Sequence, residues 1–157
     1  MGSGPVSQGA AGTATAPPVA GRVVLLEAPE GAAAEFWGIL GDGGAQVSWC
    51  PGPEGPSPAW CPLMAGRRCS LVESADVVIF ALGLETAPCR QVLAELERLH
   101  PETAVIVQAS APDAARWSPV LDGHTVLPAP LSRDTLLHEV AAAAAAFCSR
   151  SAASHEV

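Results

Sequence analysis

The chain has 157 residues and a formal net charge of −8, and 49% of it is hydrophobic while only 4% is aromatic. This length accommodates one domain with a tail, whose core must be built from valine, leucine, isoleucine and alanine. A negative chain without a basic stripe is unsuited to nucleic acids, and no apolar run approaches the roughly 18 residues that cross a bilayer. The sequence contains no lysine, which excludes a Walker A phosphate loop and Schiff-base chemistry at a lysine.

Residues 1–20 are mostly small, polar or proline. They are predicted to form a disordered tail, because they cannot bury enough apolar surface to offset the entropy of ordering. They lack a positively charged segment followed by an apolar one, so no signal peptide is expected and the protein is predicted to be cytoplasmic. One domain is expected over residues 21–149, and residues 150–157 are expected to be a flexible C-terminal tail.

The first half of the expected domain contains two strands and one helix. Residues 22–27 form a continuous apolar run, which is typical of a strand covered on both faces. Residues 31–41 carry apolar side chains at helical spacing, and residues 45–49 form a second, short strand. Residues 50–60 contain four prolines and two glycines, so a long loop is expected there.

The middle of the domain continues the alternation of helices and strands. A short helix is expected within residues 62–74, and the apolar run 76–82 is the clearest strand of the chain. Residues 88–100 form the clearest helix, with proline in the first turn and one apolar face. Another strand is expected over residues 103–108, followed by a short helix near residues 112–121.

A fifth strand and a last helix complete the domain. The strand is expected over residues 125–129, and Pro128 indicates an edge position in the sheet. The helix is expected to start at its cap, Ser132, and to run through a polyalanine stretch to Phe147. This alternation predicts an α/β fold, a flavodoxin-like three-layer sandwich with a five-stranded parallel sheet. A ligand would bind at the carboxyl ends of its strands.

The order and spacing of these elements resemble the receiver domain of bacterial response regulators, and the resemblance covers residues 22–148. That family has an acidic pair after its first strand, a phosphate-accepting aspartate at the end of the third, a serine or threonine at the end of the fourth, and Lys-Pro after the fifth. The residues at or beside these places here are Glu27, Ala28, Pro29, Ala81, Gln108, Ala129 and Pro130. Of these, Pro130 matches the family, in which it forms a cis-proline turn.

The other places lack the groups that the family's phosphate chemistry requires. Carboxylates at the strand ends hold a Mg²⁺ ion, the acceptor must itself be a carboxylate, and a lysine balances the developing charge. Ala28 and Pro29 replace the acidic pair, and Ala81 replaces the acceptor. Glu27 and Glu30 are interpreted as an ordinary strand-end charge and a charge at a helix start. The resemblance therefore implies a pseudo-receiver that is not an enzyme, needs no cofactor and is not phosphorylated on aspartate.

Such a module would act by binding, so the expected partner is another signalling or regulatory protein, with a homodimer as a further option. Receivers dimerise through the face of the fourth helix, fifth strand and fifth helix, and an alanine-rich last helix would permit close approach there. Neither nucleic acid nor membrane is expected as a partner. A small α/β enzyme or nucleotide binder with unfamiliar motifs remains an open hypothesis.

Cys50, Cys61 and Cys69 lie within twenty residues and suggest an alternative function, a redox or metal sensor. Structural zinc sites usually have four ligands with closely spaced pairs, so a fourth ligand would have to come from Cys89, His124 or a partner chain. A Cys61–Cys69 disulfide is another option, and neighbouring arginines could lower the pKa of the Cys69 thiol. The remaining alternative is that these thiols are small buried hydrophobic groups that anchor the loop.

Overall fold

The structure is a computed structural model that describes residues 19–53 and 61–154. Most of the predicted N-terminal tail and residues 54–60 of the proline-rich loop lie outside these ranges. Over the two described ranges, none of the helices combines the length and the apolar character that a membrane crossing requires.

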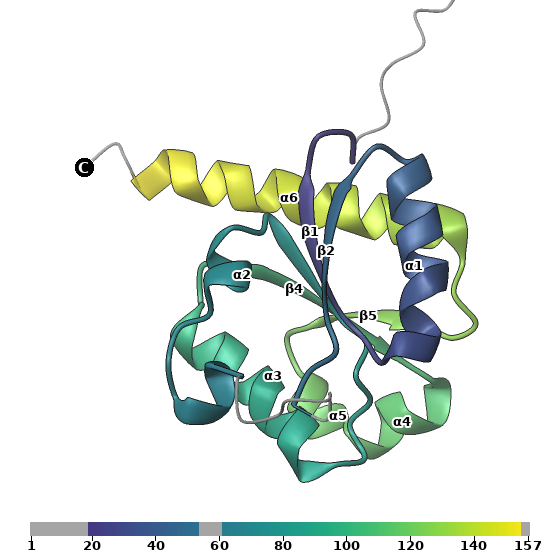
Figure 1. Cartoon of the computed structure of the whole chain (residues 1–157), viewed down its shortest axis with the longest axis vertical. Coiled ribbons are helices and arrows are strands. Elements are labelled where there is room, and N and C mark those ends of the chain that lie inside the picture. Colours follow the sequence, from purple (N-terminus) through teal and green to yellow (C-terminus); the bar gives the residue numbers. More distant parts are fainter. Residues whose placement is uncertain (1–18, 54–60, 155–157) are drawn as a thin grey trace, which may run out of the picture.

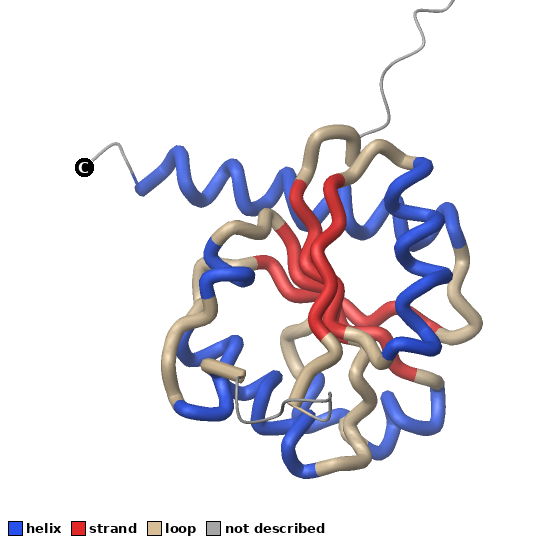
Figure 2. Tube along the Cα trace, viewed as in Figure 1, coloured by secondary structure: helices blue, strands red, loops and turns tan. Residues whose placement is uncertain are grey.

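A five-stranded parallel sheet forms the centre of the domain (Figures 1 and 2). The strand order is β2-β1-β3-β4-β5, so β2 and β5 lie at the edges. The strands are β1 (Val23–Glu27), β2 (Gln46–Cys50), β3 (Val77–Phe80), β4 (Ala104–Ala109) and β5 (Thr125–Pro128). The predicted α/β fold with five parallel strands is confirmed, and so is the edge position that Pro128 indicated.

Helices cover both faces of this sheet, with α1 and α6 on one face and α2 and α3 on the other. They are α1 (Glu30–Asp42), α2 (Ser70–Glu73), α3 (Ala87–Leu99), α4 (Ala111–Arg116), α5 (Ser118–Leu121) and α6 (Arg133–Ser154), with a short 3-10 helix, η2 (Leu63–Ala65), before α2. The two short helices expected from the sequence are each divided in two. Gly66 turns the chain in a left-handed conformation, φ 68°, after η2, and Pro119 has no N–H with which to continue α4.

The last helix is longer than the sequence indicated. Its predicted end at Phe147 is wrong, because α6 continues to Ser154, through residues that were expected to begin a flexible tail. Residues 148–154 contain no glycine or proline that would stop the helix, and two of them are alanine, the residue with the highest helix propensity. Figure 1 shows this end of α6 extending beyond the sheet.

The central strands β1 and β3 are buried on both faces, which explains their continuous apolar sequences. Leu25 and Phe80 belong to a cluster of buried residues on the face of α3. Leu26 and Phe36 belong to a second cluster on the face of α1 and α6. Because successive side chains of a strand point to opposite faces, the side chain of Glu27 lies on the α3 face with that of Leu25.

Candidate functional site

The carboxyl ends of the parallel strands form the edge at which the sequence predicted a degenerate phosphate site. Glu27 at the end of β1 is in register with Phe80 at the end of β3. The next residue, Ala81, donates its backbone N–H to the carbonyl oxygen of Glu27 at 2.7 Å. The structure therefore brings the predicted acceptor position directly beside the end of β1.

The remaining predicted positions lie along the same edge. Ala28 is fully buried after β1, and Pro29 directly precedes α1. Gln108 lies on β4 opposite Leu127 of β5. The peptide bond between Ala129 and Pro130 is cis, as the resemblance to receivers implied. The predicted positions thus lie along one edge of the sheet.

The burial of Glu27 is the feature of this edge that the sequence analysis missed. The residue is only 3% exposed, and its Oε2 atom has no hydrogen-bond partner within the described residues. Burial raises the pKa of its carboxyl from 4.5 to about 7. Its interpretation as an ordinary strand-end charge is therefore wrong. The sequence feature that could have indicated this burial is the apolar run that ends in Glu27. A strand that is covered on both faces can bury its last residue as well.

Cys50 lies next to Glu27, at the end of the edge strand β2. Burial raises the pKa of the Cys50 thiol to about 11, and the charge of Glu27 acts in the same direction. The following turn packs closely on the end of β3, because a Cβ atom on Gly52 would lie 2.6 Å from Leu82 Cδ1. At neutral pH the Cys50 thiol is therefore protonated and a weak nucleophile.

The three clustered cysteines do not form the metal site that was considered. Across the described ranges, no group of three or more histidine, cysteine or acidic side chains is placed to hold a metal ion. Cys61 and Cys69 are free thiols, so the considered disulfide is not formed. Cys69 is buried in the α3-side cluster, and Cys50 and Cys61 pack against that cluster. This arrangement corresponds to the alternative in which the thiols fill apolar space.

The loop between β3 and α3 is held in place by Arg90. Its Nη1 atom donates to the carbonyl oxygens of Leu84, at 2.7 Å, and Glu85, at 3.0 Å. The guanidinium group also lies 4.4 Å from the ring centre of Trp117, in a cation–π contact. Arg90 thus connects the segment that follows Ala81 to Trp117, which lies between the two short helices that follow β4.

The hydroxyl group of Ser110, two residues beyond Gln108, is engaged in a helix cap. It accepts the backbone N–H of Asp113 at 3.2 Å and donates to the carboxylate of the same residue at 2.8 Å. This cap begins α4, in the position where serine stabilises a helix start.

The edge does not fit a magnesium ion as receivers hold it. Mg²⁺ prefers several oxygen ligands that include ionised carboxylates. Here Glu27 is the acidic side chain at the ends of the central strands, and its raised pKa opposes the charged form. Ala28 and Ala81 supply no further side-chain ligand.

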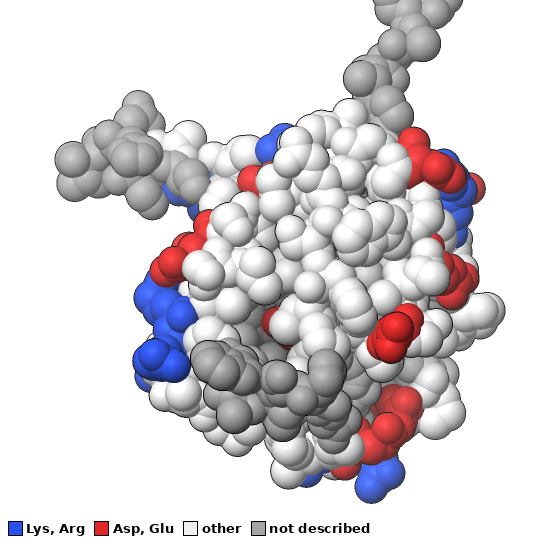
Figure 3. Space-filling model, viewed as in Figure 1, with Lys and Arg blue, Asp and Glu red and all other residues white. Residues whose placement is uncertain are grey.

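A largely uncharged surface lies over β2 and the adjacent part of α1 (Figure 3). Two tryptophans are exposed on these elements, Trp37 of α1 at 47% and Trp49 of β2 at 37%. The indole N–H of Trp49 donates to the carbonyl oxygen of Ala28 at 2.8 Å, which links this surface to the end of β1.

Comparison with known proteins gives the fold independently of these residues. No family model matches the chain, and no curated protein matches it. Among solved structures, NtrX from Brucella abortus superposes with a TM-score of 0.64 at 15% identity, covering 87% of this chain and 29% of that protein. The chain thus spans under a third of the length of NtrX.

Two isolated receiver domains are similar over almost their whole length. One is the signal receiver domain of an HD domain-containing protein from Pseudomonas fluorescens Pf-5, with a TM-score of 0.60, 19% identity, and coverage of 90% of this chain and 96% of that one. The other is the receiver domain of the sensor histidine kinase PA1611 from Pseudomonas aeruginosa PAO1, with magnesium in its active-site cleft. Its TM-score is 0.60 at 13% identity, covering 80% of this chain and 99% of that domain. The described chain therefore has the receiver fold.

Proposed function

We propose that this domain is a receiver-like signalling module that acts by binding another protein and accepts no phosphoryl group at the carboxyl edge of its sheet. The observation that carries the proposal is the position of Ala81. This residue follows β3 and is hydrogen-bonded to the end of β1, where a receiver places its phosphate-accepting aspartate. A methyl side chain has no oxygen that could attack a phosphoryl donor.

The charges around Ala81 support the same proposal. A phosphoryl group carries negative charge, which a receiver balances with a metal ion and a lysine. The chain contains no lysine, and Ala129 stands where the resemblance to receivers would place one. Glu27, the carboxyl that remains at this edge, is buried and would repel an incoming phosphate when ionised.

The proposal of a protein partner is supported by the surface over β2 and α1. Tryptophan is enriched at protein interfaces and often carries much of the binding energy there. Trp49 is held by its hydrogen bond to Ala28, so its ring would lose little conformational freedom on binding. The proposed occupant is another signalling protein, and a second copy of the chain is the alternative that a sedimentation experiment would reveal.

The experiment that tests the phosphate part is incubation of the full chain with acetyl phosphate and Mg²⁺, followed by intact mass spectrometry. An active receiver domain in the same tube would show that the reagents work. We expect the receiver to gain the mass of a phosphoryl group and this chain to gain none. A phosphoryl adduct on an acidic side chain of this protein would contradict the proposal.

A further inference from the structure

Ala28 connects the buried carboxyl group of Glu27 to the exposed side chain of Trp49. It donates its backbone N–H to the carbonyl oxygen of Cys50 at 3.2 Å, and its own carbonyl oxygen accepts the indole N–H of Trp49 at 2.8 Å. Glu27 directly precedes Ala28 and is itself in register with Cys50. A movement of the chain at Glu27 therefore acts on the hydrogen bond that holds Trp49.

The groups that surround the carboxyl of Glu27 are apolar side chains and thiols. Burial raises the pKa of this carboxyl, and no cation of the described residues counteracts the effect. On one side β3 ends in Phe80, and on the other β2 ends in Cys50, whose thiol is protonated at neutral pH. The thiols of Cys61 and Cys69 also act on the pKa of Cys50, so they lie on the same side of the sheet.

The arginines on the helices of this side are engaged elsewhere. Arg68, just before α2, forms ion pairs of 2.6 Å with Glu73 and Glu102. Arg90 of α3 donates to two backbone carbonyl oxygens of the loop before its helix. Neither guanidinium group thus serves as a counter-charge for Glu27.

Ionisation of Glu27 would require water to reach it, because a buried carboxylate without a partner is costly. β3 is buried along its whole length, whereas β2 lies at the edge of the sheet and Cys50 is only partly buried. The end of β2 is therefore the side on which water can enter with the least disruption of the core. Separation of β1 and β2 there breaks the bond between Ala28 and Cys50 and frees Trp49.

We infer that Glu27 is a proton-binding site that controls the surface around Trp49. With the proton bound, the ends of β1 and β2 stay paired and the indole ring is held against Ala28. When the carboxyl releases its proton to water, the end of β2 opens and the ring becomes mobile. Since the pKa of Glu27 is about 7, this change occurs near neutral pH.

The consequence for partner binding rests on the proposed function. A protein that binds the surface over β2 and α1 while Trp49 is held would prefer the protonated form of the domain. Its affinity should fall as the pH rises above 7. By reciprocity, the bound partner would strengthen the binding of the proton to Glu27.

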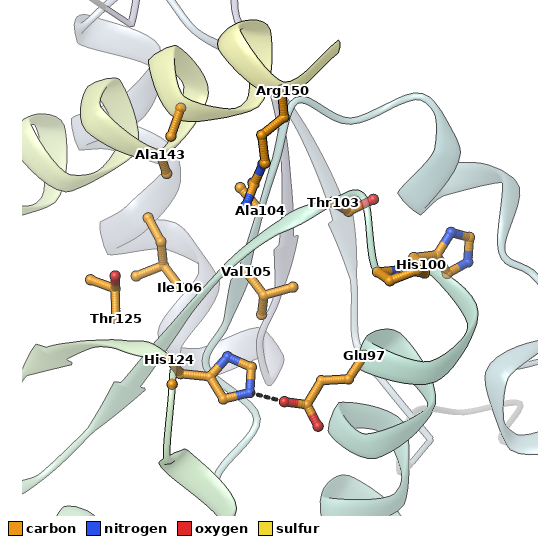
Figure 4. Close-up of a pocket in the computed structure, with 13 residues that line it drawn as sticks. Glu97, His100, Thr103, Ala104, Val105, Ile106, His124, Thr125, Ala143 and Arg150 are labelled. Carbon is orange, nitrogen blue, oxygen red and sulfur yellow. Dashed lines mark ion pairs between the residues drawn. The ribbon is translucent and has the colours of Figure 1, made fainter. Parts of the chain in front are cut away.

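Two histidines with buried side chains lie at the opposite end of the sheet and titrate independently of this edge. The Nε2 atom of His124, just before β5, lies 2.6 Å from Glu97 Oε1 of α3 (Figure 4). His100 accepts the backbone N–H of Cys69 at its Nε2 atom, and Figure 4 shows its ring pointing away from His124. A pH response at Trp49 can therefore be distinguished from the titration of these histidines.

The test is an NMR titration of the full, ¹⁵N-labelled chain between pH 5.5 and 8.5. It follows the indole N–H signal of Trp49, identified by its loss in Trp49→Phe, and the amide signal of Ala28. We expect both signals to shift in one common transition with a midpoint near pH 7. In Glu27→Gln neither signal should change with pH, because the amide side chain cannot ionise.

Further variants separate this transition from general effects of substitution. Glu27→Met, a second neutral replacement of similar length, should also abolish the transition. Glu35→Gln, which removes an exposed carboxyl of α1, should keep it. The signals of Gly123 and Thr125 beside His124 should titrate alike in Glu27→Gln and in the unaltered protein.

The inference is overturned if the signals of Trp49 and Ala28 do not move with pH, or if they move equally in Glu27→Gln. Such a result would leave the proposed function standing, because the incubation with acetyl phosphate tests that function at constant pH. A phosphoryl adduct would in turn contradict the proposed function without affecting the transition at Glu27.

Discussion

Glu27 carries a carboxyl group that the fold buries, and among the described residues its Oε2 atom has no hydrogen-bond partner. Its pKa is raised by burial from 4.5 to about 7, so the folded chain binds this proton more tightly than the unfolded chain does. The contribution of the group to stability is therefore complete below about pH 4.5. It is lost progressively as the pH rises through 7, where the buried group must become charged.

We predict that Glu27→Gln removes this pH dependence. The shift from 4.5 to about 7 corresponds to roughly 3 kcal/mol of unfolding free energy. Relative to the unaltered protein, the variant should gain about this amount between pH 4.5 and somewhat above pH 7, because its neutral amide never has to ionise. Urea denaturation at a series of pH values measures the difference.

The matched control for this experiment is Glu35→Gln, which makes the same chemical change at an exposed position of α1. Its unfolding free energy should follow that of the unaltered protein across the whole pH range. If the unfolding free energy of Glu27→Gln also changes with pH in parallel with that of the unaltered protein, the carboxyl of Glu27 is not buried as described.

At the scale of elements, α1 has two adjacent aromatic residues of which one packs in the core and the other is exposed at the surface. Phe36 is 1% exposed and lies in the cluster between the sheet, α1 and α6, whereas Trp37 is almost half exposed. Helical geometry explains the difference, since a step of one residue rotates the side chain by more than a quarter of a turn. The same helix thus serves the core and the uncharged surface.

We predict very different costs for truncating these two aromatic side chains. Phe36→Ala should lower the unfolding free energy by about 3–5 kcal/mol, because it leaves a cavity in the core. Trp37→Ala should change it by about 1 kcal/mol or less, as substitutions at exposed positions usually do. Chemical denaturation with unchanged m-values checks both, and similar losses for the two variants would contradict the packing of α1.

The elements that the sequence predicted well are those whose signal is local. β3 and α3 were clear because an unbroken apolar run and an apolar helical face each appear within a dozen residues. The end of α6 was missed because residues 148–154 are polar enough to suggest a tail, although nothing in them stops a helix. The division of the helices expected at 62–74 and 112–121 depends on two single residues, Gly66 and Pro119. A single turn-forming residue is a weaker signal for prediction than a long pattern of apolar residues.

At the scale of the whole molecule, the fold followed from the alternation of strands and helices, but the burial of Glu27 did not. Glu27 is in register with Cys50 of β2 and with Phe80 of β3, so its burial depends on strands that are far apart in the sequence. This burial has no sequence pattern, because it depends on how separate elements pack.

The central claim is that the carboxyl edge of the sheet keeps the receiver backbone without its phosphate chemistry. The most direct measurement is an NMR spectrum of the ¹⁵N-labelled chain with and without Mg²⁺ and beryllofluoride, which mimics a bound phosphoryl group. The account predicts that the amide signals of Ala81, Gly83 and Ser110 remain in place. Saturable shifts of these signals would contradict it, since they would show that Mg²⁺ and a phosphoryl analogue bind at this edge.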